Sequence, residues 1–191
     1  ANGNTLTYDV DGTGVQLPRT FLYDGVNRPI AITRNGLAAI FAYGADSERV
    51  SKSWNGNTTH FLGPDADLLI NAANPTGLLG SNLHPDIRRE GLATDYQIKD
   101  HLASNRLTLR HGGTTPNQHN YSPTGQPLTS NGSILASGKG YINERFDPET
   151  GLQYLHFRYY DPLFDRFFTP DTWDPIIAEV DVNRYAYSAN D

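Results

Sequence analysis

Residues 29–43 read PIAITRNGLAAIFAY and carry the strongest indication of the fold. The Asn35-Gly36 pair stands between two strand-like runs, PIAITR and LAAIFAY. Asn-Gly is the preferred pair for a two-residue type I′ turn, because both turn residues need a positive φ angle. We therefore expect an antiparallel β-hairpin here.

The same turn signal recurs along the chain. Asn55-Gly56 separates the runs VSKSW and TTHFL, which predicts a second hairpin. Two more Asn-Gly pairs begin at Asn2 and Asn131. Repeated hairpins of this kind favour an antiparallel sheet built from neighbouring strands.

A second repeated feature is an aromatic residue at a strand end, followed by Asp or a small residue and then by a turn. Its members start at Tyr8, Tyr23, Tyr43, Tyr121, Phe146 and Tyr160. We expect the ring to pack in the sheet while the Asp side chain binds the turn backbone. Such units bury their apolar faces only by stacking on one another, so the pattern predicts a repeat architecture.

Composition points to the same class. Gly 18 and Pro 12 supply many turn residues, while Tyr 11, Phe 8 and Trp 2 supply the rings that suit half-buried sheets. We therefore predict an all-β fold. The densest aromatic cluster, residues 154–173, is interpreted as core packing, with a sugar- or partner-binding surface as the alternative.

Charge and missing residue types exclude several functions. Lys and Arg number 15 against 21 Asp and Glu, a net charge of −6, so we expect no nucleic-acid partner. No apolar run approaches the roughly 18 residues of a membrane-spanning helix, and the N-terminus carries no signal-peptide pattern. The absence of Cys excludes disulfides and thiolate chemistry. The absence of Met predicts a piece of a longer protein whose targeting signal lies elsewhere.

The chain divides into three predicted parts. Residues 1–62 hold hairpin repeats, 63–110 form an irregular connecting segment with short strands, and 111–191 form a C-terminal segment. Within the second part, two strands flank 100–106. Within the third, 111–120 is predicted to be a loop and 152–160 one strand covered on both sides.

Motifs for cofactors and metals are weak. The run DVDGTG at 9–14 suggests a calcium loop, but it lacks a bidentate Glu at its end, and a plain turn is the preferred interpretation. The six His residues show no metal-ligand spacing, and His156 is interpreted as a packed strand residue. No nucleotide, dinucleotide or serine-hydrolase motif is present, so we expect no cofactor and no independent enzyme activity.

Four further segments occur in a fixed order. They are DHLASNRLTL at 100–109, YSPTGQPL at 121–128, ERFDPETGLQYLHFRYYDPLFDRFFTPDTWDP at 144–175 and NRYAYSAND at 183–191. Together with the aromatic-Asp repeats they resemble the Rhs/YD-repeat family along essentially the whole chain. The resemblance is to the end of the Rhs core, just before the variable C-terminal toxin.

This resemblance implies a β-sheet strip wound spirally into a hollow shell, with teneurins and Tc toxin C components as relatives. The implied function is to enclose and deliver a toxin domain. The implied partners are the rest of the shell, the toxin domain and a secretion or delivery apparatus such as type VI secretion, with a secreted or cell-surface location. The alternative is a cell-surface adhesion module that binds glycans or a partner protein.

The resemblance also implies an aspartic autoprotease that cuts downstream of the core. Asp171, in the run FTPD, matches the family's upstream aspartate, and Asp174 and Arg166 are weaker candidates for the same site. Two carboxylates that share a site push one pKa up and so provide an acid and a base. An Arg orients a carboxylate through its bidentate fork. The alternative for both Asp residues is turn formation, and for Arg166 a pair with an exposed acid.

Three departures bear on this site. Asp165 stands where the family usually has Gly, and Pro170 where some relatives have Arg. The second aspartate and the cleaved bond fall beyond Asp191, so we expect only half of the site within these residues.

Overall fold

The computed structural model describes residues 7–8, 19–130, 138–171 and 183–187. They form a 13-stranded sheet and a 4-stranded sheet, and in both every strand pairs with its neighbour in the chain. All pairs are antiparallel. The predicted all-β fold of hairpin repeats is confirmed.

The large sheet contains β1 (Thr7–Tyr8), β2 (Arg19–Tyr23), β3 (Pro29–Arg34), β4 (Leu37–Tyr43), β5 (Arg49–Trp54), β6 (Asn57–Phe61), β7 (Ala66–Ile70), β8 (Leu78–His84), β9 (Ile87–Glu90), β10 (Ala93–Lys99), β11 (Asn105–Arg110), β12 (Asn117–Tyr121) and β13 (Pro127–Ser130). The 3-10 helix η2 (Tyr141–Asn143) leads to the small sheet of β14 (Arg145–Asp147), β15 (Leu152–Leu155), β16 (Arg158–Asp161) and β17 (Arg166–Phe167).

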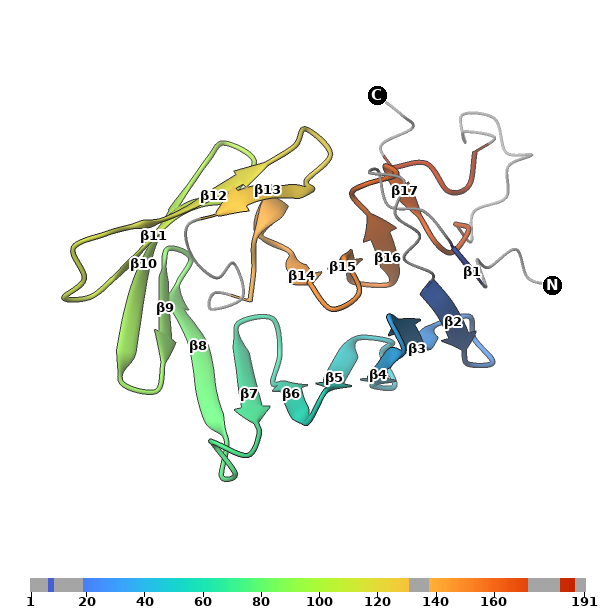
Figure 1. The fold of residues 1–191 in the computed structure, drawn as a ribbon, viewed down its shortest axis with the longest axis horizontal. Coiled ribbons are helices and arrows are strands. Elements are labelled where there is room, and N and C mark those ends of the chain that lie inside the picture. Colours follow the sequence, from blue (N-terminus) through green and yellow to red (C-terminus); the bar gives the residue numbers. More distant parts are fainter. Residues whose placement is uncertain (1–6, 9–18, 131–137, 172–182, 188–191) are drawn as a thin grey trace.

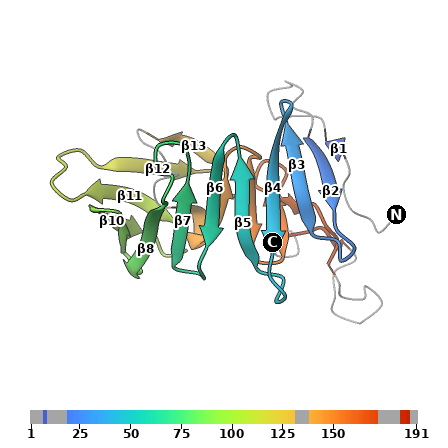
Figure 2. The ribbon, with the colours of Figure 1, turned by 90° about the horizontal axis from the view of Figure 1, so that it is seen from below.

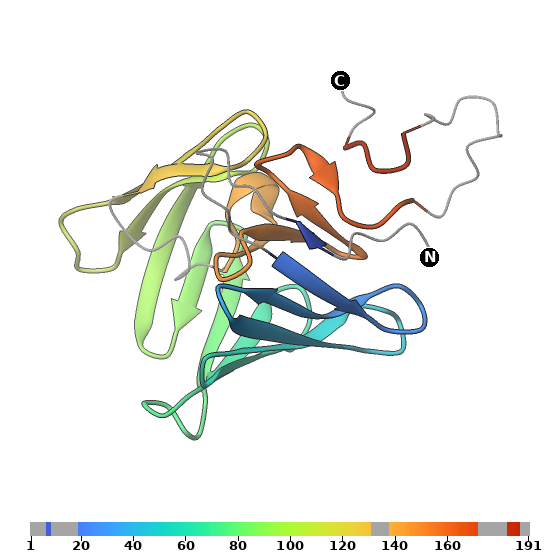
Figure 3. The same cartoon turned by 45° about the vertical axis from the view of Figure 1, so that its right-hand side comes forward.

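The large sheet is curved, and the small sheet lies on its concave side. Figure 1 shows β2–β7 along the bottom, β8–β11 rising on the left and β12–β13 returning over the top, with β14–β17 inside this curve. Figure 2, from below, shows β2–β7 side by side as a continuous wall. In Figure 3 the small sheet lies over the blue strands as a separate layer.

The two described Asn-Gly turns have the backbone that their sequence demands. Asn35 and Gly36 have φ angles of 53° and 75°, and Asn55 and Gly56 have 47° and 75°. Both turns join adjacent paired strands. The hairpins predicted from these pairs are confirmed, while the pairs at Asn2 and Asn131 lie outside the described residues.

The expected turn role of the Asp residues is confirmed after Tyr23, and Asp100, which follows Lys99 and was not among the predicted members, has the same geometry. One carboxylate oxygen of Asp24 accepts hydrogen bonds from the backbone N–H groups of Val26 (3.0 Å) and Arg28 (2.9 Å). Asp100 accepts from the N–H groups of Leu102 and Ser104 in the same way. Each Asp replaces backbone partners that the turn itself lacks.

Three segments differ from the sequence expectation. Residues 63–110 are not irregular, because β7–β11 continue the large sheet, and Pro64, Pro75 and Pro85 lie between strands rather than inside them. Residues 111–120 are not entirely a loop, because β12 begins at Asn117. The three-part division of the chain stays a prediction.

The run 152–160 is not one strand but the hairpin β15–β16. It turns at His156, which has a φ of 54° and a side chain 59% exposed, so His156 is neither a strand residue nor a packed one. A left-handed backbone at a non-Gly residue is uncommon. Aromatic residues alternate before and after His156, so the sequence pattern did not indicate a turn there.

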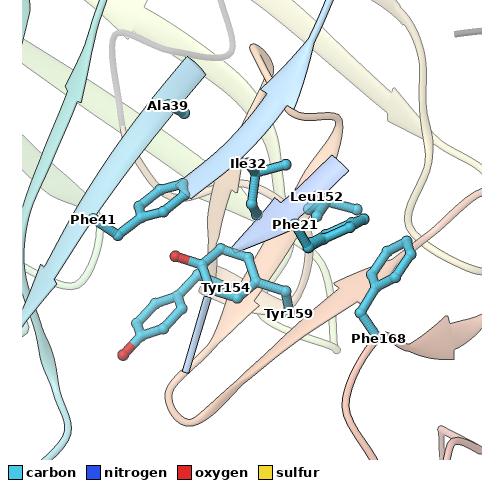
Figure 4. Packing of buried hydrophobic residues seen from close by; sticks show 8 residues of the cluster. All are labelled: Phe21, Ile32, Ala39, Phe41, Leu152, Tyr154, Tyr159 and Phe168. Atoms are coloured by element: carbon cyan, nitrogen blue, oxygen red, sulfur yellow. The ribbon is translucent and has the colours of Figure 1, made fainter. Parts of the chain in front are cut away.

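The apolar core joins the two sheets where β2–β4 face β15–β16. Its buried members are Phe21, Ile32, Ala39, Phe41, Leu152, Tyr154, Tyr159 and Phe168, shown in Figure 4. The ring centroids of Phe21 and Phe168 lie 4.6 Å apart, and those of Phe41 and Tyr159 lie 5.3 Å apart. Core packing is therefore confirmed for Tyr154, Tyr159 and Phe168 of the aromatic cluster. Phe157, by contrast, is 65% exposed, and Trp173 lies outside the described residues.

Candidate functional site

The concave face beside this core carries buried charge. Arg49 and Lys52 on β5 reach Asp147 at the end of β14, and the side chains of Arg49 and Asp147 are each 1% exposed. Arg49 donates from both Nη atoms to the Asp147 carboxylate, and Lys52 Nζ lies 2.8 Å from Asp147 Oδ1. Lys52 Nζ also lies 2.7 Å from Glu149 Oε1. A buried carboxylate is thus shared by two cations.

A β-bulge places both cations on the same face. Strict alternation would put Arg49 and Lys52, three positions apart, on opposite faces of β5. The register with β4 shifts at this point, so that Lys52 pairs with Phe41 and Arg49 pairs with Tyr43. The extra residue turns Arg49 toward the concave side.

Aromatic rings surround the Arg49 guanidinium. Its Cζ lies 4.4 Å from the ring centroid of Tyr154 and 4.7 Å from that of Phe61. Arg49 Nη1 also donates to the Tyr159 hydroxyl at 3.1 Å. Rings stabilise a desolvated cation through their negative faces, so the cage supports the ion pair with Asp147.

The protonation states follow from this arrangement. Burial alone would raise the pKa of Asp147, but the charges of Arg49 and Lys52 and their hydrogen bonds outweigh it and hold that pKa below its usual value. Burial raises the pKa of the Tyr159 hydroxyl well above its usual value. Asp147 is therefore ionised and Tyr159 neutral at physiological pH.

Two further groups of ion pairs lie on the same face. Arg19 Nη1 at the start of β2 lies 2.6 Å from Asp161 Oδ2, and the Asp161 side chain is fully buried. Asp67 on β7 accepts from Arg88 at 2.8 Å and from Arg145 at 3.1 Å. The Arg19, Arg49 and Arg145 contacts each bridge the large sheet and the small one.

Sequence reasoning missed this network, although a signal for it exists. Asp147 and Asp161 follow Phe146 and Tyr160 and were expected to serve their own turns. Asp161 does accept from the backbone N–H of Leu163, but its second oxygen binds Arg19. On β2 the alternating pattern places Arg19 on the same face as Phe21, and a cation on an apolar face needs a buried acid.

Two of the predicted catalytic residues, Asp171 and Arg166, lie in the described part of the chain, on or just after β17. Asp171 follows β17, and its carboxylate oxygen lies 3.1 Å from Arg158 Nη2, with the side chain 38% exposed. The backbone N–H of Asp171 donates to the carbonyl of Arg184, whose side chain donates back to the carbonyl of Asp171. The structure thus holds Asp171 by its backbone and leaves its carboxylate partly open.

Arg166 is exposed on β17 and pairs through its backbone with Asp161 and Ala186. Asp174 lies outside the described residues. Arg158, which the sequence did not single out, is the cation beside Asp171. Burial lowers the pKa of Arg158, and the charge of Asp171 counters this. The catalytic roles of Asp171, Asp174 and Arg166 stay predictions.

Within the described ranges, no group of three or more His, Asp or Glu side chains is arranged to hold a metal ion. The run 9–14 lies outside them. None of the helices in the described part of the chain is long and apolar enough to cross a membrane.

Comparison with known proteins gives sequence relatives along the whole chain. No family model matches it. The chain is 27% identical over 207 residues to the tRNA3(Ser)-specific nuclease WapA of Bacillus spizizenii, and 26% identical over 208 residues to the tRNA nuclease WapA of Bacillus subtilis. Each match covers 99% of this chain and 9% of the relative. Salivary gland surface protein 1 of Aedes aegypti is 34% identical over 95 residues, covering 49% of this chain and 3% of that protein.

Solved structures share the fold. The TcdB2–TccC3 crystal structure matches with a TM-score of 0.71 and 16% identity, over 90% of this chain and 10% of that one. A Photorhabdus luminescens Tc holotoxin pore with a TccC3 mutation matches with a TM-score of 0.72 and 18% identity, over 90% and 9%. The chain therefore has the antiparallel β-sheet fold of the Rhs-repeat shell of Tc toxins, and it spans about a tenth of the relatives it matches.

Proposed function

We propose that this chain is a wall segment of an Rhs/YD-repeat shell that encloses and delivers a C-terminal toxin domain. The observation that carries the proposal is the placement of β14–β17 on the concave side of the 13-stranded sheet, held there by the buried pairs of Asp147 and Asp161. A sheet whose strands pair with their chain neighbours leaves few open edges, and its curvature provides an inside.

The partners in this proposal are the rest of the shell, the toxin domain and a delivery apparatus, and the location is secreted or cell-surface. The tRNA nuclease names of the Bacillus relatives support a toxin-bearing parent. The shared fold of the Tc toxin chains supports a shell.

The proposal includes release of the toxin by self-cleavage. Asp171 acts as one carboxylate of the site, with Asp174 and Arg166 nearby in sequence. One carboxylate takes a proton from water, the resulting hydroxide adds to the peptide carbonyl, and a second carboxylic acid gives a proton to the departing amine. Support comes from the position of Asp171, partly exposed and anchored by Arg184 and Arg158.

Limited proteolysis of the full-length parent tests the enclosure. We expect its toxin domain to resist added protease, while the same domain made alone is degraded, because an enclosing wall excludes the protease. Gel analysis over a time course measures both rates. Equal rates of degradation would contradict enclosure and leave the adhesive alternative.

A further inference from the structure

A pocket of about 270 Å³ lies on the concave face, beside the ion pairs. Inward residues of β5, β6, β7 and β9 form one wall, and β14 with the turn after it forms the other. Its apolar lining includes Trp54, Phe61 and Leu69 from the large sheet and Phe146 from the small one. The pocket therefore combines aromatic and charged side chains.

The cations of this pocket already have partners. Arg49 and Lys52 bind Asp147, and Arg88 and Arg145 bind Asp67. An anionic ligand would have to displace one of these carboxylates from a buried pair. Such a displacement would leave a buried charge without its partner, which is strongly unfavourable, so the pocket disfavours anions.

Glu90, at the end of β9, is half-buried, and no hydrogen bond or ion pair to its carboxylate exists among the described residues. Burial raises the pKa of Glu90, and the charges of Asp67 and Asp95 act in the same direction, whereas the charges of Arg88 and Arg110 oppose this. A partly desolvated carboxylate without a donor is costly to the folded protein, and a ligand that brings N–H donors would offset that cost.

We propose that this pocket binds a cationic side chain, lysine or arginine, of the polypeptide held inside the shell. The ammonium or guanidinium group binds the Glu90 carboxylate, and the alkyl stem lies along Trp54 and Leu69. The source of the side chain rests on the proposed function, whereas the pocket and its preference for a cation do not. A shell with such pockets holds an extended polypeptide through the basic residues of that polypeptide.

Titration of the 191-residue chain with n-butylguanidinium tests the site. Trp54 and Trp173 are the two tryptophans, so a Trp173→Phe background makes Trp54 fluorescence the reporter. We expect a saturable change with n-butylguanidinium and none with n-butyrate. Glu90→Gln should weaken binding about tenfold, which corresponds to about 1.4 kcal/mol. Glu48→Gln, an exposed acid outside this pocket, should bind like the parent.

The unmodified protein gives a second test that does not depend on how Glu90→Gln folds. Because the cation binds the ionised carboxylate, its affinity should fall as the pH is lowered through the raised pKa of Glu90. Equal binding of the two probe ions, or an affinity unchanged by both Glu90→Gln and acidification, would overturn the proposal. If the pocket binds the cation but the toxin domain of the full-length parent is not protected from added protease, only the enclosed polypeptide is excluded as the source of the cationic side chain.

Discussion

Asp147→Ala should lower the free energy of unfolding by about 3–5 kcal/mol, because it leaves Arg49 and Lys52 without their shared buried partner. The Arg49 side chain is 1% exposed, so water does not replace the lost carboxylate. Urea unfolding followed by tryptophan fluorescence measures the change. We expect the lower free energy of unfolding to arise mainly from weaker packing of the small sheet against the large one.

Asp65→Ala is the matched control. The Asp65 side chain is 66% exposed and lies 3.4 Å from Lys139, a surface pair worth about 0–1 kcal/mol. The double variant Arg49→Met with Asp147→Leu should be more stable than Asp147→Ala, because it removes the buried charges together. A change of less than 1 kcal/mol in Asp147→Ala would show that the pair does not hold the sheets together.

The stability of the unmodified chain should depend on pH through Asp147. Its folded-state pKa lies below the unfolded value of about 3.9, so its contribution is present above that pH and is lost as the pH falls through the folded pKa. As the pH falls below this unfolded value, the unmodified chain should therefore lose stability more steeply than Asp147→Ala. Urea midpoints at several pH values measure both slopes, and equal slopes would contradict the lowered pKa.

Asp171→Asn should abolish self-cleavage of the full-length parent, since an amide neither takes a proton from water nor returns one to the amine. Intact mass and a denaturing gel distinguish the cut protein from the whole one. Asn retains a side-chain oxygen for Arg158 and leaves the backbone bonds to Arg184 unchanged, so the fold should persist.

Asp65 is an exposed acid that is distant in sequence from Asp171, so Asp65→Asn should leave self-cleavage unchanged. If the unmodified full-length parent is cut just downstream of Asp191 while its Asp171→Asn variant stays whole, the autoprotease is established. If the Asp171→Asn parent is cut like the unmodified one, the aspartate has only a structural role. If neither is cut, the proposed self-cleavage is contradicted.

Local features of the fold were predictable because their causes are local. Asn35-Gly36 and Asn55-Gly56 demand a left-handed turn wherever they stand, and their strands pair with the next residues of the chain. The turn role of Asp24 likewise spans four residues. Such signals need no knowledge of distant segments.

The candidate site was less predictable because its partners are distant. Arg49 and Asp147 are separated by 98 positions, and Arg19 and Asp161 by 142. The bulge that turns Arg49 inward depends on the register with β4, which residue types do not specify. Glu90 was not recognisable either, because only the curved sheet shows that it lines a pocket whose described donors bind other acids.

The all-β class, the hairpins and the resemblance to an Rhs shell follow from the amino-acid sequence alone, since turn chemistry and strand pairing act between near neighbours. Packing of the two sheets was needed to show that β14–β17 lie on the concave side, that the run 152–160 turns at His156, and which acids neutralise which arginines. Burial decides these points, because a charge removed from water takes whatever opposite charge the packed sheets bring within reach.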